Sequence, residues 1–192
     1  MTPIIHRVNS IKGLEKVPSS SGIELDVRSS DAGLILNHEP GISGESFSNF
    51  LEVYSHDLLV VNIKEAGIEK DVINSLSNNN IENYFLLDIE FPFLLQNHKQ
   101  LGQHLSVRFS KYESIETANN FAKTVNWLWI DTYEDFEINS YNAEIIRQFN
   151  TCLVSPTRWG MHEKLEYFIQ KFKKYKLEID YVMIENGEIA EY

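Results

Sequence analysis

Two carboxylates placed two residues apart are the first feature of this sequence that could do chemistry. Glu24 and Asp26 alternate with aliphatic residues across residues 22–28, so one face of an extended strand is apolar and the other is acidic. At the rise of a strand the two carboxylates lie about 7 Å apart, which suggests a divalent cation between them. His38 ends the next apolar run, where a proton donor or acceptor could meet whatever the cation holds. The alternative is a solvated edge strand with a surface histidine, and the pair alone leaves both interpretations open.

The elements that would position these residues alternate regularly along the chain. Eight apolar stretches are expected strands, at residues 4–8, 22–28, 58–64, 84–90, 104–110, 125–131, 151–155 and 179–184. Helices are expected between them, and the longest covers residues 161–175. Regular alternation of this kind predicts parallel strands joined by helical crossovers. Eight units favour an α/β fold of one type, a compact (β/α)8 TIM barrel, over an open sheet.

The length of the chain limits this barrel. The 192 residues lie below the usual lower limit of about 200 for the fold, so we expect short loops and no helix after the last strand. Residues 1–192 are expected to form a single barrel domain with a sizeable core. The alternative is a doubly wound sheet, but the glycine-rich first turn of its nucleotide-binding version is missing from the sequence.

Polar residues collect at the predicted strand ends, where a parallel barrel has its site. The residues expected there are His6, Arg7, Glu24, Asp26, Arg28, Asn62, Lys64, Asp88, Glu90, Arg108, Ser110, Asp131 and Ser155. Burying an unpaired charge is costly. The large number of ionisable residues at these strand ends therefore indicates a ligand that pairs with them. The alternative is a ring of mutually satisfied ion pairs that fills the barrel.

Trp129 is a further candidate for the pocket. It shares one face of the strand 125–131 with Trp127 and Asp131. Packing against the outer helices is one interpretation of the two tryptophans. In the other, Trp129 lines the mouth of the site, where its ring could contact a sugar, a base or an acyl chain.

Four ordered motifs carry a resemblance to a known family. They are His6-Arg7, Gly22-Ile-Glu-Leu-Asp-Val27, Asp31-Ala-Gly-Leu-Ile-Leu-Asn-His38 and Val61-Asn-Ile-Lys64. In order and spacing they resemble the glycerophosphodiester phosphodiesterases, part of the phosphatidylinositol-phospholipase-C-like phosphodiesterase superfamily. The motifs cover the first third of the chain, and the remainder agrees only as an alternating β/α pattern.

The resemblance implies a metal-assisted attack on a phosphodiester. It implies that Glu24 and Asp26 bind one divalent cation, Mg²⁺ or Ca²⁺, which neutralises the phosphate oxygens. His6 and His38 would be catalytic, one taking a proton from the attacking oxygen and the other giving one to the leaving oxygen. The anionic oxygens would be held by Arg7, Lys64 and Arg108. In many relatives a neighbouring hydroxyl of the substrate attacks first, giving a cyclic phosphate that water then opens.

The sequence departs from the family pattern at three places. Val8 stands where a glycine usually follows the His-Arg pair, and the Glu-Asn-Thr signature is replaced by a short loop through Val17-Pro18. The third metal-binding carboxylate is replaced by Asn62. An amide oxygen can still bind a hard cation but adds no charge, so we expect weaker metal affinity unless Asp88 or Glu90 contributes.

Composition restricts the partners. The formal net charge of −11 argues against unaided binding to nucleic acid or to an anionic membrane surface. The sequence shows no secretory signal and no apolar run of about 20 residues, so we expect a cytoplasmic protein. A single cysteine, Cys152, excludes an intramolecular disulfide. We expect a small-molecule phosphodiester as the substrate, and an oligomer is compatible with the sequence.

Three functional hypotheses follow. The first is a phosphodiester hydrolase that uses two histidines and a divalent cation. The second is a binding module, a catalytically weak or inactive barrel that retains the phosphate site after losing the third carboxylate. The third is a structural barrel whose acids are ion-paired. Retention of His6 and His38 favours the first, because a pure binder has no need of paired proton-transfer groups.

Overall fold

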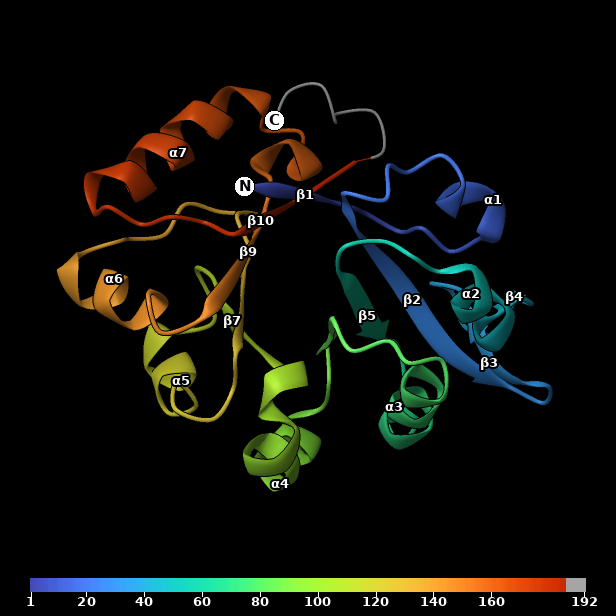
Figure 1. The fold of residues 1–192 in the computed structure, drawn as a ribbon. Helices are drawn as coiled ribbons and strands as arrows, with labels where there is room; N and C mark the ends of the chain where they lie inside the picture. Colours follow the sequence, from blue (N-terminus) through green and yellow to red (C-terminus); the bar gives the residue numbers. More distant parts are fainter. Residues whose placement is uncertain (186–192) are drawn as a thin grey trace. The chain divides into compact units, whose positions relative to one another are not determined.

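The computed structural model describes residues 1–185, and the chain divides into two compact units. Residues 4–95 form the N-terminal unit, and residues 1–3 with the chain from residue 96 onward form the C-terminal unit. Each unit contains parallel strands and the helices that connect them (Figure 1). The units are therefore described one at a time.

Four parallel strands form the sheet of the N-terminal unit. They are β1 (Thr2–Ile5), β2 (Gly22–Ser30), β5 (Leu59–Ile63) and β6 (Tyr84–Leu87). β2 pairs with β1 and with β5, and β6 pairs with the other edge of β5. The register places Asp26 beside Asn62. Every residue of β5 is buried, as expected for a continuous apolar run covered on both faces.

A hairpin adds two strands that the count of eight did not include. The end of β2, residues 27–30, pairs antiparallel with β3 (Gly33–Leu36), which pairs with the two-residue β4 (Glu45–Ser46). Gly33 has φ +105°, a conformation that glycine adopts without a side-chain clash. The apolar run that leads to His38 is thus an antiparallel extension of β2.

Serine side chains cap the first two helices of this unit. In α1 (Ile11–Leu14) the Ser10 side chain accepts a hydrogen bond from Gly13 N, and in α2 (Phe47–Val53) Ser46 accepts one from Asn49 N. α3 (Glu69–Asn78) buries an apolar stripe that includes Val72 and Leu76. α4 (Phe91–Leu101) has a proline in its first turn and runs from this unit into the next.

The C-terminal unit contains the other four predicted parallel strands. These are β7 (Ser106–Phe109), β8 (Trp127–Ile130), β9 (Asn150–Val154) and β10 (Tyr181–Ile184), paired in that order. Thr2, at the start of β1, belongs to this unit and donates its backbone N–H to Asp180 O at 2.8 Å. The α/β class and the parallel pairing within each unit are confirmed. Closure of the eight strands into a barrel stays a prediction.

The helices of this unit are short. They are α5 (Ile115–Asn119), α6 (Ser140–Ile146) and α7 (Leu165–Lys174), with 3-10 turns at Gly102–His104, Pro156–Trp159 and His162–Lys164. The helix predicted from residue 161 starts later, at Leu165. Gly160 has φ +72° and Met161 is not helical, so the chain turns before the helix can begin. The expected absence of a helix after the last strand concerns residues outside the described part of the chain.

Two further expectations can be checked on the described residues. None of their helices combines the length and the apolar character that crossing a membrane requires. Cys152 lies buried in β9 as a free thiol.

Candidate active site

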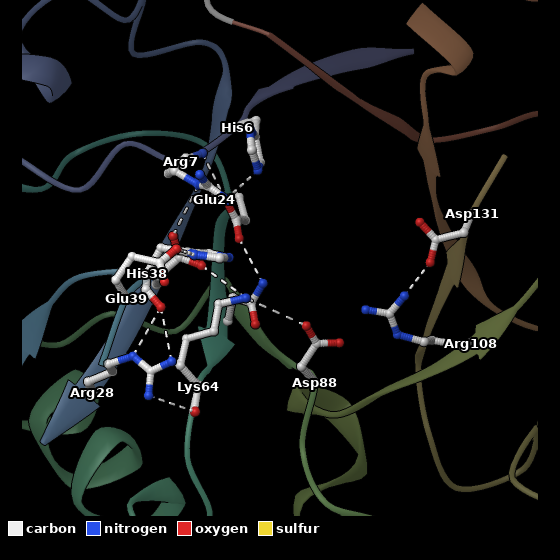
Figure 2. Close-up of polar contacts among 12 residues, drawn as sticks. His6, Arg7, Glu24, Arg28, His38, Glu39, Lys64, Asp88, Arg108 and Asp131 are labelled. Carbon is white, nitrogen blue, oxygen red and sulfur yellow. Dashed lines mark hydrogen bonds and ion pairs between the residues drawn. The ribbon is translucent and has the colours of Figure 1, made fainter. Parts of the chain in front are cut away.

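The carboxyl ends of three parallel strands bring six predicted site residues together in the N-terminal unit (Figure 2). Two directly follow β1, two lie in β2, one lies in β5 and one directly follows β5, and they are His6, Arg7, Glu24, Asp26, Asn62 and Lys64. Because parallel strands end at one edge of their sheet, residues far apart in the sequence meet there. The backbone reinforces this placement, since Val8 N donates to Glu24 O at 2.7 Å.

Glu24 is buried among hydrogen-bond donors. Its Oε2 accepts the Arg7 backbone N–H at 2.8 Å and lies 3.9 Å from His6 Nε2, and its Oε1 accepts a hydrogen bond from Asn62 Nδ2 at 3.0 Å. Burial, and then the charge of Asp26, raise the pKa of Glu24 to about 7, against the lowering effect of these hydrogen bonds and of Lys64. Glu24 therefore changes its charge near neutral pH.

Asp26 is surrounded by positive and amide groups. Its Oδ1 lies 3.1 Å from Lys64 Nζ, and its Oδ2 lies 3.6 Å from Arg7 Nε. Asn9 makes two bonds with the same residue, because its Nδ2 donates to Asp26 Oδ2 and its Oδ1 accepts from Asp26 N, both at 2.8 Å. Asn9 was not predicted as a site residue. Nothing in its local sequence marks it, because both bonds depend on the pairing of β1 with β2.

Arg7 has an unusual backbone. Its φ is +55°, in the left-handed region that non-glycine residues seldom occupy and that usually costs of order 1 kcal/mol or more. In this conformation the backbone N–H of Arg7 reaches Glu24 while its guanidinium lies near Asp26. One residue thus contacts both carboxylates of the acid pair.

Asn62 provides the test of whether these residues fit a divalent cation. Its Oδ1 is a buried acceptor without a hydrogen-bond partner among the described residues, and the residue is 7% exposed. Such an orphaned oxygen beside two carboxylates suits a hard cation, which prefers oxygen ligands. Within residues 1–185, however, no group of three or more His, Cys, Asp or Glu side chains could hold a metal ion. The donor set fits the cation in chemical type, with only two negative charges.

His38 follows β3 and is held from two directions. Its Nδ1 lies 2.6 Å from Glu39 Oε1, and this contact lowers the pKa of the Glu39 carboxyl. Its backbone carbonyl accepts hydrogen bonds from Arg28, and the preceding residue, Asn37, donates its N–H to Asp26 O at 3.1 Å. The end of the hairpin is thereby tied to the strand that carries the acid pair.

Lys64 contacts two carboxylates, one in β2 and one directly after β6, the strands that pair with either edge of β5. Its Nζ is 3.1 Å from Asp26 Oδ1 and 3.8 Å from Asp88 Oδ2. Asp88 follows β6 with φ +58°, again in the left-handed region. A polar cavity of about 210 Å³ adjoins this lysine, and its lining includes Asp88 and Glu90. Asp88 and Glu90 therefore line one cavity with Lys64.

The remaining predicted residues belong to the C-terminal unit. Arg108 Nη1 donates to Asp131 Oδ2, and its Nε lies 3.9 Å from Glu113 Oε1. Trp129 is buried in β8. A role for Arg108 in binding phosphate, and for Trp129 and Asp131 in the pocket, stays a prediction.

Two crystal structures of other proteins share this fold. One is a glycerophosphodiester phosphodiesterase from Agrobacterium tumefaciens, similar over 95% of this chain and 96% of its own, with a TM-score of 0.60 at 13% identity. The other is a glycerophosphoryl diester phosphodiesterase from Parabacteroides distasonis, with a TM-score of 0.66 at 10% identity over 99% of this chain and 85% of its own. No protein-family model and no curated protein matches the sequence. The resemblance inferred from the motifs is confirmed at the level of the fold.

Proposed function

We propose that this chain is a metal-dependent phosphodiester hydrolase resembling the glycerophosphodiester phosphodiesterases, built as a closed (β/α)8 barrel. The observation that carries the proposal is the convergence of His6, Arg7, Glu24, Asp26 and Lys64 at one edge of a parallel sheet, beside Asn62, whose Oδ1 has no partner among the described residues. The shared fold of the two phosphodiesterase structures supports it. The substrate is a small-molecule phosphodiester.

The cation site consists of Glu24, Asp26 and Asn62. These residues would hold one Mg²⁺ or Ca²⁺ through two carboxylates and one amide oxygen. When bound, the cation supplies positive charge to the phosphate oxygens. Arg7 and Lys64 add positive charge from the protein, and Arg108 is proposed as a third such group.

Proton transfer is assigned to the two histidines. One of His6 and His38 accepts a proton from the attacking water as its oxygen forms the new bond to phosphorus. The other donates a proton to the alcohol oxygen as the old bond to phosphorus breaks. Hydrolysis of the diester thus yields a phosphomonoester and an alcohol. Glu39, at 2.6 Å from His38 Nδ1, orients that ring.

A binding protein without turnover is the second candidate function. One observation favours it: the position beside Glu24 is an amide that donates to that carboxylate, where a third negative charge would strengthen cation binding. In this candidate the phosphate site is retained, and a phosphodiester binds without being cleaved.

Activity on bis(4-nitrophenyl) phosphate with Mg²⁺, Ca²⁺ or Mn²⁺ tests the proposal. Whichever of His6→Ala and His38→Ala removes the proton acceptor should lower kcat by about a hundredfold or more. The variant that loses the proton donor should be less affected, because 4-nitrophenolate is a good leaving group. His162→Ala, in the exposed turn before α7, is the matched control and should equal wild type. Equal turnover in all four proteins would refute the proposed mechanism. Phosphate binding without turnover in the wild type would favour the binding protein.

A further inference from the structure

One guanidinium bonds to the main chain at two site residues. Arg28 Nε and Nη2 donate to the backbone oxygen of His38 at 3.1 and 2.9 Å, and Nη1 donates to the backbone oxygen of Lys64 at 3.1 Å. Figure 2 shows the planar group between the two carbonyls. The bonded residues lie in different segments, one after β3 and the other after β5.

The strand register explains why Arg28 reaches both segments. Val27, the preceding residue of β2, pairs with Leu36 of β3 and with Ile63 of β5. Arg28, still within β2, therefore follows the residue that pairs with the last residues of both β3 and β5, and its side chain is 15% exposed. Glu65 adds an anchor, because its Oε2 lies 3.7 Å from Arg28 Nη1 and its Oε1 accepts Ser29 N at 2.6 Å.

Arginine is suited to this arrangement and lysine is not. A guanidinium presents five N–H donors in a rigid plane, so it can bond to two carbonyls in fixed directions. A lysine ammonium keeps the charge, but it is a compact group on a flexible stem and cannot reproduce the planar fork. The contacts of Arg28 with His38 and Lys64 go only to backbone oxygens, which leaves both side chains available for chemistry.

We propose that Arg28 is a positioning residue that holds the histidine and the lysine of the active site in a fixed relation to each other. This inference rests on the proposed function, in which His38 transfers a proton and Lys64 binds the phosphate. Arg28 itself stays with the main chain. Loss of the guanidinium bonds to the two backbone oxygens lets the two segments move independently. A phosphate bound by Lys64 is then no longer aligned with the His38 ring.

The test compares Arg28→Lys and Arg28→Gln with wild type and with Arg147→Lys. Arg147 is an exposed arginine that also donates to a backbone carbonyl, that of Tyr175, and so is a matched control. Hydrogen exchange is measured at two amides, Glu39 N, which donates to Asn37 Oδ1, and Lys64 N, which donates to Val27 O. Both should exchange about tenfold faster in Arg28→Lys and in Arg28→Gln, and neither in Arg147→Lys.

Kinetics on bis(4-nitrophenyl) phosphate distinguish positioning from charge and from general stability. Arg28→Lys should lower kcat and raise KM, each by about tenfold, because the residues for proton transfer and for phosphate binding both shift from their positions. The melting temperature should stay near that of wild type. Wild-type kinetics in Arg28→Lys would show that charge alone suffices and would overturn the inference. Unchanged exchange at either amide in both variants would also overturn it. Absence of turnover in wild type would refute the proposed function, while the exchange data would still decide whether Arg28 joins the two segments.

Discussion

The strand ends of the two units carry similar residue types in different states. In the N-terminal unit the pKa of buried Glu24 is raised, and the Asn62 side chain has an oxygen with no partner among the described residues. In the C-terminal unit the buried Asp131 carboxylate accepts a hydrogen bond from Arg108, which also lies near Glu113. Ionisable strand ends therefore do not identify a site by themselves. Incomplete pairing separates the first group from the second.

Ser110 shows how thoroughly the second group is bonded. Its Oγ donates to Glu113 Oε2 at 2.9 Å and accepts from Tyr133 Oη at 2.9 Å. The same oxygen lies 3.1 Å from two backbone N–H donors, those of Tyr112 and Glu113. The interpretation of the strand ends as mutually satisfied polar groups suits this cluster. It does not suit the acid pair of β2, because the neighbouring Asn62 oxygen has no partner among the described residues.

The largest expected effect comes from neutralising Glu24, with the same change at a carboxylate of the second group as the control. Glu24→Gln should lower activity by about a thousandfold, because the proposed cation loses half of its negative ligand charge. It should also abolish the rise in melting temperature that Mg²⁺, Ca²⁺ or Mn²⁺ gives the wild type. Glu113→Gln, the matched change in the C-terminal unit, should retain both properties. Equal behaviour of the two variants in assay and melt would remove the distinction between the groups.

Arg108→Met tests the group in the C-terminal unit, where we expect the main effect on stability and not on activity. It leaves the buried Asp131 carboxylate without its guanidinium, so the free energy of unfolding should fall by about 2 kcal/mol. Urea denaturation measures this change. Lys64→Met should cost less, because Asp26 keeps its bonds to Asn9. A wild-type unfolding midpoint for Arg108→Met would contradict the structural role, and a raised KM would support the predicted contact with phosphate.

The pKa of Glu24 predicts how stability depends on pH in metal-free protein. Folding raises this pKa from the ordinary 4.5 to about 7, so the native state binds more protons than the unfolded state between these values. The contribution of Glu24 to the free energy of unfolding therefore falls as pH rises through this window and stays low above it. Denaturation at a series of pH values measures this change. Across the window, the free energy of unfolding of wild type relative to Glu24→Gln should fall by up to about 3 kcal/mol. A difference independent of pH would contradict the raised pKa.

The smallest expected effect concerns the departure at Asn62. Asn62→Glu adds a third carboxylate, so Mg²⁺ or Ca²⁺ affinity measured by calorimetry should rise about tenfold. Without metal the same variant should be less stable than wild type, since two buried carboxylates then repel each other. Unchanged affinity would mean that residue 62 does not face the cation. Asn62→Asp is the shorter matched change and should act in the same direction.

The sequence predicted the parts of the site that depend on one strand or on strand order. The alternation in β2 placed Glu24 and Asp26 on one face, and the order of parallel strands brought Asn62 and Lys64 beside them. The contacts of Asn9 and the double attachment of Arg28 depend on register between strands, which no local pattern specifies. The β3–β4 hairpin was missed as an addition to the sheet for the same reason.

β2 makes the geometry of the site sensitive to chain length. Its nine residues pair with β1, β3 and β5, so its register is fixed along both edges. A one-residue deletion at Leu25 would turn Asp26 and the side chains that follow it to the opposite face and so separate the two acids. A deletion in the loop before Gly22 would leave the strand intact. Natural variation in length should therefore be found before and after this strand, and related chains should keep the spacing from Glu24 to Arg28.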